Sequence, residues 1–353
     1  MTSASAISLP EGFAAAPVKN SGLPPRIQTA LRARGITTLG QLSQPPPDCE
    51  KLSGDDRAWL ARVAGYVRHL AGKKTPPPLH LSEWLQLFLP PRQVEILETH
   101  FGLRPANDRP VWRASTLQQT GARFGITRER VRQLLRDARA TLRRPLPLWA
   151  AGPIFHAMEN ALQAVGGVMD TAQLERQESA AWAGYVPIGV FHGLADLQPE
   201  RVGIYRGFFS LFPSTLLDRA ERALQDRLRR AGRLLSIAEI AGQLPAKAQP
   251  PPPYSAEPLI QMLARHIPGM LATVDGRVGL AARDGAELLG EILLTTGEAN
   301  LRTLQAELNA RLLPESQRGS GYIRDTLQRA PRIRRTAPVR YELSGGIQTS
   351  LPL

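Results

Sequence analysis

Apolar positions recur at intervals of three and four residues along most of the chain, and the spacing is most regular between Thr116 and Arg144. This spacing is typical of helices that bury one side. The expected buried positions of this segment are Phe124, Ile126, Val131, Leu134, Ala138 and Leu142. Gly121 supplies a small residue where two helices would cross, and Gly125 can adopt a positive φ in the turn between them. The pattern predicts a helix-turn-helix whose first helix is capped by Thr116.

The polar side of the second helix contains the residues of this segment that could bind a ligand. At roughly 100° per residue, four residues fall away from the apolar stripe: Glu129, Arg132, Gln133 and Arg136. Arg, Gln and Glu are the residue types that contact base edges in a major groove. Arg130 points elsewhere on the helix, and we expect it to form a local ion pair with Asp137. The segment is interpreted as a DNA-reading helix, and the alternative is a solvated basic face in an ordinary helical bundle.

The first half of the chain adds a second helical segment. Residues 1–20 lack periodicity and are predicted to be a flexible tail. Residues 21–72 are predicted to form a small all-α module of two helix-hairpin-helix-like units, with Ser53-Gly54-Asp55 as a hairpin between two helices. Residues 73–80 form a proline-rich linker, and residues 81–148 continue through two further helices into the helix-turn-helix.

The second half contains one pattern three times. Gly167, Gly232 and Gly297 lie 65 positions apart, and each interrupts a helix–glycine–helix segment that ends in a strand-like stretch. Three helices and a β-hairpin per unit predict a winged helix, and Asp275-Gly276 is a strong two-residue hairpin signal. The predicted boundaries of the three copies are 152–217, 218–283 and 284–345. Residues 245–254 are rich in proline and are interpreted as an insertion between helices of the second copy.

Arginine is concentrated in the last copy. Arg332, Arg334 and Arg335 lie in its predicted wing, where they are candidates for contact with DNA or with a protein, or for a solvated edge that prevents strand pairing. The first copy is more apolar, and we expect it to pack against another domain or a protein. Its aromatic residues are Trp182, Phe191, Phe208, Phe209 and Phe212.

Composition narrows the class of protein. A net charge of +13 and an isoelectric point near 10.7 indicate a polyanionic partner. The single cysteine, Cys49, rules out an internal disulfide and a cysteine-based zinc site. No catalytic or phosphate-binding motif occurs and the six histidines are dispersed, so we expect no enzyme activity, no cofactor and no metal. The start of the sequence has no signal-peptide pattern and no stretch is long enough to span a membrane, which predicts a cytoplasmic, nucleoid-associated protein.

The segment Leu89–Pro145 closely resembles region 4 of bacterial primary sigma factors. LPPRQVEILETHFGL stands where that family has its first helices, and TLQQTGARFGITRERVRQ is nearly continuous with its −35-reading motif. The resemblance implies that base contacts with a −35-like element come from Arg128, Glu129, Arg132 and Gln133. It also implies phosphate contacts, which would come from Thr116, Leu117, Arg123, Arg136, Arg139, Arg143 and Arg144.

The module at 21–72 resembles the C-terminal domain of the bacterial RNA polymerase α subunit, on the basis of residues such as Arg26, Ile36 and Gly40. In that family an arginine matching Arg26 enters the minor groove. This chain has Asp55 and Asp56 where the family has lysines, and these carboxylates would repel phosphate. Arg26 is therefore a candidate for contact with either DNA or protein. The three later copies resemble the winged helices of the polymerase δ subunit family.

Together these segments predict a mainly α, multi-domain array: a helix-hairpin-helix-like module, a sigma region-4-like helix-turn-helix and three winged helices with small β-hairpins. No segment resembles sigma region 2, so the predicted function is a sequence-specific DNA-binding transcription protein that reads a −35-like element in double-stranded DNA and modulates initiation. The alternative is an interaction protein that binds bacterial RNA polymerase, at the β flap through Trp84–Leu103 or at the α subunit, with only non-specific affinity for DNA.

Overall fold

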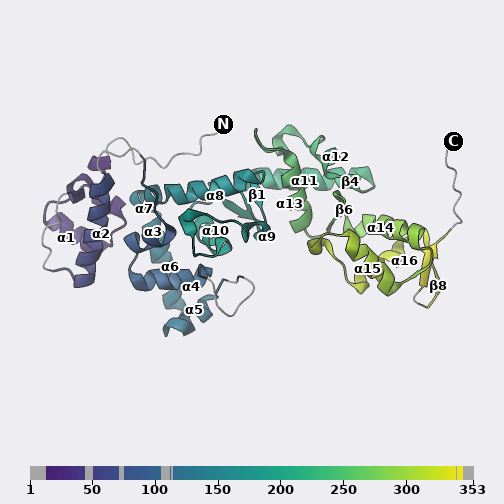
Figure 1. Ribbon diagram of the computed structural model, residues 1–353, viewed down its shortest axis with the longest axis horizontal. Helices are drawn as coiled ribbons and strands as arrows, with labels where there is room; N and C mark the ends of the chain where they lie inside the picture. The colour runs from purple at the N-terminus through teal and green to yellow at the C-terminus, as the bar shows by residue number, and fades with distance from the viewer. Residues whose placement is uncertain are drawn as a thin grey trace. The chain divides into compact units, whose positions relative to one another are not determined.

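The computed structural model of the chain describes residues 13–43, 51–70, 75–104, 112, 114–338 and 340–344. Most of these residues are helical, and the strands are short (Figure 1). The predicted mainly α fold class is therefore confirmed. Contacts divide the chain into two compact units: unit 1 comprises Met1–Ala164 and Asp170–Ile204, and unit 2 comprises Val165–Met169 and Tyr205–Leu353.

The first described part of unit 1 is a small helical module, which includes residues 13–20 of the predicted flexible tail. Its elements are η1 (Phe13–Ala15), η2 (Val18–Ser21), α1 (Pro25–Ala33), η3 (Gly40–Ser43) and α2 (Gly54–Leu70). Proline at the first position of α1 suits a helix start because its missing N–H needs no partner there. Ile27 and Leu31 of α1 are fully buried, as is Leu42 of η3. The second short helix expected here is thus only a 3₁₀ turn.

The start of α2 differs from the prediction. Ser53-Gly54-Asp55 was expected to be a hairpin between two helices, but α2 begins at Gly54. The Ser53 hydroxyl accepts a hydrogen bond from the Asp56 N–H at 3.1 Å, so Ser53 acts as the cap of this helix. The residues just before it that the structure describes, Lys51 and Leu52, form a turn and not a helix, and residues 44–50 lie outside the described residues.

The helix-turn-helix domain follows in the same unit. Its helices are α3 (Leu81–Phe88), α4 (Pro91–Phe101), α5 (Leu117–Phe124), α6 (Arg128–Leu142) and α7 (Pro145–Ala150). The indole N–H of Trp84 donates to the Pro147 carbonyl at 2.8 Å and joins α3 to α7. The indole of Trp59 in α2 donates to the Leu87 carbonyl at 3.1 Å, so the N-terminal module packs directly on this domain.

The predicted core of this domain needs two corrections. Val131, Ala138 and Leu142 are buried as expected, but Leu135 is buried where Leu134 had been predicted. Phe124 and Ile126, which were also expected to be buried, are only partly buried. The first error displaces the apolar stripe of α6 by one residue, because neighbours on a helix differ by only about 100°.

Three repeats with the same order of elements follow. The first repeat contains α8 (Gly152–Ala164), β1 (Val168–Met169), α9 (Thr171–Leu174), η4 (Ala180–Trp182), α10 (Pro187–Ala195), β2 (Gly203–Tyr205) and β3 (Phe208–Ser210). The second contains α11 (Ser214–Ala231), β4 (Leu235–Ser236), α12 (Ile237–Ala241), η5 (Ala246–Ala248), α13 (Ala256–His266), β5 (Met270–Ala272) and β6 (Arg277–Leu280). The third contains α14 (Ala281–Thr296), β7 (Ala299–Asn300), α15 (Leu301–Arg311), η6 (Pro314–Ser316), α16 (Ser320–Arg329), β8 (Ile333–Ala337) and β9 (Arg340–Leu343).

Each repeat closes a three-stranded sheet in the same way. The strand orders are β1-β3-β2, β4-β6-β5 and β7-β9-β8, so the last strand of each repeat lies between the other two. The hairpins were predicted, but the two-residue first strands β1, β4 and β7 were not. Gly167, Gly232 and Gly297 have φ values of +88°, +69° and +71°, and each follows the first helix of its repeat. This backbone conformation favours glycine and explains the regular spacing.

The cores of unit 2 connect neighbouring repeats. One cluster contains Phe208 and Phe212 of the first repeat together with Leu217 of α11 and Leu263 of α13. A second cluster surrounds Leu288 and Ile292 of α14. The aromatic end of the first repeat therefore packs against the second repeat, as its apolar composition predicted.

Candidate nucleic-acid interface

Local capping and two glycines hold the helix-turn-helix in shape. The Thr116 hydroxyl accepts from the Gln119 N–H at 3.2 Å, and the Gln119 side chain accepts from the Thr116 N–H at 2.9 Å. This capping box satisfies donors at the start of α5. Gly125 has a φ of +64° in the turn. A Cβ at Gly121 would lie 2.6 Å from the Ile126 carbonyl oxygen, so only glycine fits where the chain turns back over α5.

The first half of α6 is exposed, and its polar side chains contact one another. Arg132 donates to both carboxylate oxygens of Glu129, at 2.7 and 2.6 Å. Gln133 donates to the same carboxylate at 3.3 Å. The hydrogen bonds from Arg132 lower the pKa of Glu129. Three of the four predicted base-reading residues thus form one network on the helix surface, and Arg128 lies exposed beside it in the first turn.

Arg130 does not form the expected pair with Asp137. Its guanidinium donates to Gln133 at 3.4 Å, and Asp137 instead lies 3.6 Å from Arg136. The reason is geometric, because Asp137 adjoins Arg136 in sequence whereas Arg130 lies seven residues, about two helical turns, away.

The second half of α6 is tied to a different part of unit 1. The Arg139 guanidinium lies 2.7 Å from the Asp196 carboxylate, at the end of α10. Arg143 donates to the Asp196 carbonyl oxygen at 2.5 Å. Two of the predicted phosphate contacts therefore have protein partners in this structure. The other three arginines predicted for this role, Arg123, Arg136 and Arg144, are exposed.

Helix α10 lies against α4 and carries Asp196 to this position. A Cβ at Gly189 would lie 2.7 Å from the carbonyl oxygens of both Phe101 and Gly102, so the two backbones touch. The Tyr185 hydroxyl donates to the buried carboxylate of Glu98 at 2.6 Å, and Arg104 binds the same carboxylate at 2.8 and 3.0 Å. Burial, followed by the contact with Glu98, raises the pKa of Tyr185.

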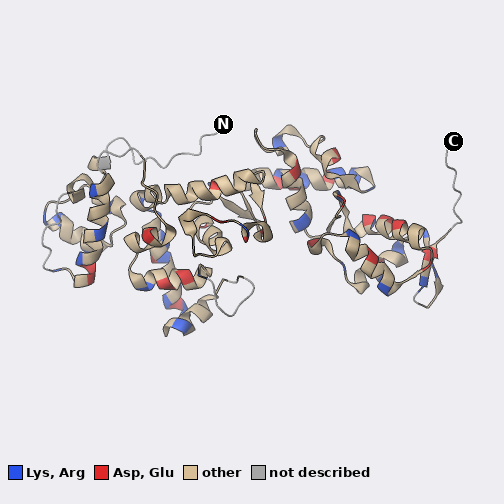
Figure 2. Cartoon of the chain, in the orientation of Figure 1, with Lys and Arg blue, Asp and Glu red and all other residues tan. Residues whose placement is uncertain are grey.

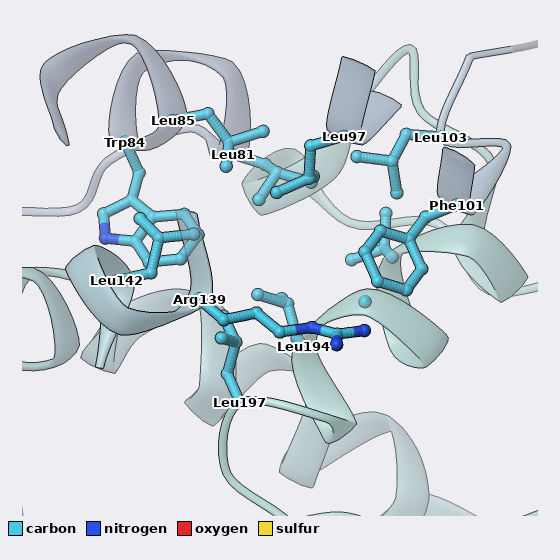
Figure 3. Close-up of a pocket in the computed structure, with 12 residues that line it drawn as sticks. Leu81, Trp84, Leu85, Leu97, Phe101, Leu103, Arg139, Leu142, Leu194 and Leu197 are labelled. Atoms are coloured by element: carbon cyan, nitrogen blue, oxygen red, sulfur yellow. The ribbon is translucent and has the colours of Figure 1, made fainter. Parts of the chain in front are cut away.

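Apolar side chains fill the seam between α10 and the helix-turn-helix domain. They surround a cavity of about 20 Å³, which is room for about one water molecule (Figure 3). Trp84, Leu97 and Leu103 face it from the helix-turn-helix domain, and Leu194 and Leu197 face it from α10 and the residues after it. The Arg139 side chain runs along this cavity, and its guanidinium lies 5.9 Å from the centre of the Phe101 ring. The seam is a packed interface and not a ligand pocket.

Arg26 is also held by a carboxylate. It donates to both oxygens of Asp56, at 2.8 and 2.7 Å. The Asp56 side chain is 9% exposed and that of Arg26 is 65% exposed. The hydrogen bonds from Arg26 lower the pKa of Asp56. The charge of Asp56, which was expected to repel phosphate, is thus neutralised within the module, and so is part of the charge of Arg26.

The arginines of the last hairpin lie at the surface. Arg334 forms an ion pair with Glu342 on the neighbouring strand, and Arg335 donates to the Ala337 carbonyl at 3.2 Å. Arg332 is exposed just before β8. Basic residues, blue in Figure 2, also occur on α6 and α11.

The described residues contain neither a metal-binding cluster nor a membrane-spanning helix. No group of three or more His, Cys, Asp or Glu side chains within the described ranges is arranged to hold a metal ion. Among the same residues, no helix combines the length and the apolar character that a membrane crossing requires.

Two side-chain contacts of this interface were not predicted from the sequence. Asp196 and Tyr185 lie more than 50 positions from Arg139 and Glu98, their partners in the structure. The apolar sequence of α10, PIGVFHGLA, could have indicated that this helix packs against another domain, because a helix that is apolar on all sides must be covered by other elements.

Comparison with known proteins finds a similarity that covers the helix-turn-helix. The model of sigma-70 region 4 matches residues 88–144, which contain α4, α5 and α6. The RNA polymerase principal sigma factor HrdC of Streptomyces coelicolor is 32% identical over 119 residues. These residues cover 34% of this chain and only 28% of the length of that relative. No solved structure matches the chain. Residues 88–144 therefore form a helix-turn-helix similar to sigma-70 region 4, which indicates a DNA-binding function related to transcription.

Proposed function

We propose that the chain binds a −35-like promoter element in double-stranded DNA through the first half of α6, and modulates transcription initiation in this way. The match of residues 88–144 to sigma-70 region 4 carries the proposal. It is supported by the exposure of Arg128, Glu129 and Arg132 on one helix.

The network on α6 suits base recognition. Arginine forms paired hydrogen bonds with guanine, glutamine with adenine, and glutamate accepts from cytosine. Glu129 holds the Arg132 guanidinium in one orientation before DNA arrives. A side chain that is already ordered loses less conformational entropy on binding. We therefore assign base contacts to Arg128, Glu129, Arg132 and Gln133.

Phosphate contacts would position this helix without adding sequence preference. Thr116 and Leu117 lie at the start of α5, where backbone N–H groups favour phosphate. Arg123 and Arg136 are exposed and able to reach a backbone. For Arg139 and Arg143 the same role requires that they share or exchange the contacts with Asp196.

Selection of bound duplexes from a random DNA library tests the proposal. The wild-type chain is expected to enrich one −35-like motif. The double variant Arg132→Ala, Gln133→Ala is expected to lose it, because each lost base contact costs about 1–3 kcal/mol. The matched variant Arg136→Ala should weaken all sequences alike. Enrichment of the same motif by the double variant would exclude these two residues as readers.

The alternative, in which the chain binds RNA polymerase and has only non-specific DNA affinity, meets an obstacle. Trp84, Leu97 and Leu103, in the segment that would dock, are buried, in part against α10. Docking through these apolar side chains would require α10 to move away. A polymerase pull-down that survives both nuclease treatment and the Arg132→Ala, Gln133→Ala change would favour this alternative.

A further inference from the structure

The β-hairpins of the three repeats, called wings 1, 2 and 3 in chain order, have different surroundings. Wing 1 (β2–β3) is joined to the first helix of the second repeat. Arg206, in its turn, donates to both carboxylate oxygens of Glu221 on α11, at 2.9 Å each. The Tyr205 hydroxyl donates to the same carboxylate at 2.5 Å. The arginine of wing 1 is therefore committed to the next repeat.

Wing 2 (β5–β6) makes the corresponding contact with the third repeat. Arg277 donates to both oxygens of Glu291 on α14, at 2.8 and 3.1 Å. The backbones also meet, because Val274 N–H donates to the Arg311 carbonyl and Leu313 N–H donates to the Ala272 carbonyl, both at 2.9 Å. Wings 1 and 2 thus act as joints, each held by a glutamate on the first helix of the following repeat.

Wing 3 (β8–β9) makes no such contact among the described residues. Arg340 pairs with Glu298 and Arg334 with Glu342, both within the third repeat. Arg324 and Arg329 on α16 and Arg332 before β8 are exposed, and none of their guanidinium groups has an ion-pair or hydrogen-bond partner in the described part of the chain. Helix α16 packs against β8, so these arginines belong to adjoining elements.

The charge of this surface indicates the chemistry of its partner. Residues 318–340 contain seven arginines and one acidic residue, Asp325. Each joint, by contrast, places a carboxylate opposite its arginine. Several guanidinium groups without facing carboxylates match a partner with closely spaced negative charges, and duplex DNA carries about one phosphate charge per 1.7 Å of its axis.

A second copy of the chain is a poorer partner for wing 3. If two copies joined in the same way as neighbouring repeats do, wing 3 of one copy would bind α8, the first helix of the first repeat, in the other copy. Glu159 of α8 is already held by Arg201 at 2.6 and 2.8 Å, and it is 5% exposed. This carboxylate is therefore not available.

We propose that the exposed side of α16 and wing 3 bind the sugar–phosphate backbone of double-stranded DNA without sequence preference. Wings 1 and 2 do not bind DNA and serve as joints between repeats. This site is separate from α6, so the two proposals can fail independently. Loss of sequence preference tests the base contacts of α6, and a lower slope of log affinity against log salt tests the third repeat.

The test measures the affinity of the full chain for a random-sequence DNA duplex over a range of salt concentrations. The background is Arg132→Ala, Gln133→Ala, which removes the proposed base contacts of α6. The variant Arg324→Ala, Arg329→Ala, Arg332→Ala is expected to lower the slope of log affinity against log salt by about three units, since each phosphate contact contributes about 0.9. Circular dichroism melting checks that this variant is folded.

A matched variant removes the same charge elsewhere. Arg57→Ala, Arg222→Ala, Arg230→Ala replaces exposed arginines of α2 and α11, and we expect its slope to change by less than about one unit. The variant with lysine at positions 324, 329 and 332 should keep the slope, because lysine binds phosphate as a point charge. An unchanged slope in the alanine variant, or equal losses in the matched variant, overturns the proposal and points to a protein partner for wing 3.

Discussion

The two halves of α6 have the same kind of sequence and different surroundings. In the first half, Arg132 and Gln133 contact Glu129 of their own helix. In the second half, Arg139 and Arg143 contact Asp196, which lies more than 50 positions away. The first half depends only on local geometry, whereas the second half depends on the docking of α10.

This difference separates two roles within one helix. A side chain paired within its own helix turn remains free to meet a ligand. A side chain paired with another element contributes to holding that element in place, and it must share or exchange the contact to bind phosphate. Under the proposed function the first half of α6 contacts DNA, whereas the second half joins the helix-turn-helix domain to α10.

The largest expected effect comes from breaking the contact between α10 and α4. Replacing Gly189 by alanine forces a methyl group against two carbonyl oxygens that lie 2.7 Å from its Cβ position. Overpacking of this kind costs about 1–3 kcal/mol in the free energy of unfolding, measured by urea denaturation. Gly193→Ala is the matched control, because its Cβ would lie 3.5 Å from the Phe101 ring, an ordinary contact. Equal stability of the two variants would show that the close approach at Gly189 does not hold α10 in place.

A smaller effect is expected from Asp196→Ala, which releases Arg139. The two side chains are 37% and 40% exposed, so the pair is worth less than about 1 kcal/mol of stability. On DNA, the slope of log affinity against log salt should become steeper by about 0.9, because Arg139 can then reach a phosphate.

Glu200→Ala removes the same charge four residues further on, at an exposed position, and serves as the control. A slope that stays unchanged in Asp196→Ala would argue against a phosphate contact by Arg139 and would leave Arg123, Arg136 and Arg144 as the arginines that support α6.

The smallest expected effect is a dependence on pH of the stability that the same seam contributes. Burial, and then the charge of Arg139, lowers the pKa of His100 on α4, and burial lowers that of His192 on α10. Because both pKa values are depressed, the unfolded chain binds more protons as the pH falls below about 6.5, and this part of the stability is present above that pH and lost below it. His100→Gln should therefore flatten the dependence of unfolding free energy on pH between about 7 and 5. The exposed His69→Gln is the control, and an equal flattening there would contradict a role for the seam.

Local patterns account for the elements that were predicted correctly. The turn at Gly125 and the cap at Thr116 depend on residues within one or two helical turns, so spacing alone located them. The glycines at 167, 232 and 297 revealed the repeats because each has positive φ at the same point of its unit. The strands β1, β4 and β7 are only two residues long, which is too short for an alternating pattern to appear.

The ion-pair partners of charged side chains were the main feature that the sequence did not predict. Asp56 was expected to be a free charge, but burial beside Arg26 makes it one half of an ion pair. Arg206 and Arg277 look as basic in sequence as Arg332, yet the first two are bound by glutamates of neighbouring repeats. Sequence position carries no information on such pairs, because they form between elements whose packing is decided by apolar side chains elsewhere.

The amino-acid sequence by itself determined the helix-turn-helix, its similarity to sigma region 4, the basic character of the chain and the three repeats. These depend on the periods of apolar residues and on glycines in turns, which act over a few residues. Only the tertiary structure decided which arginines are exposed and unpaired and which are joined to carboxylates. Ion pairs form after the apolar faces have packed, so the availability of each charge for DNA depends on what the fold brings next to it.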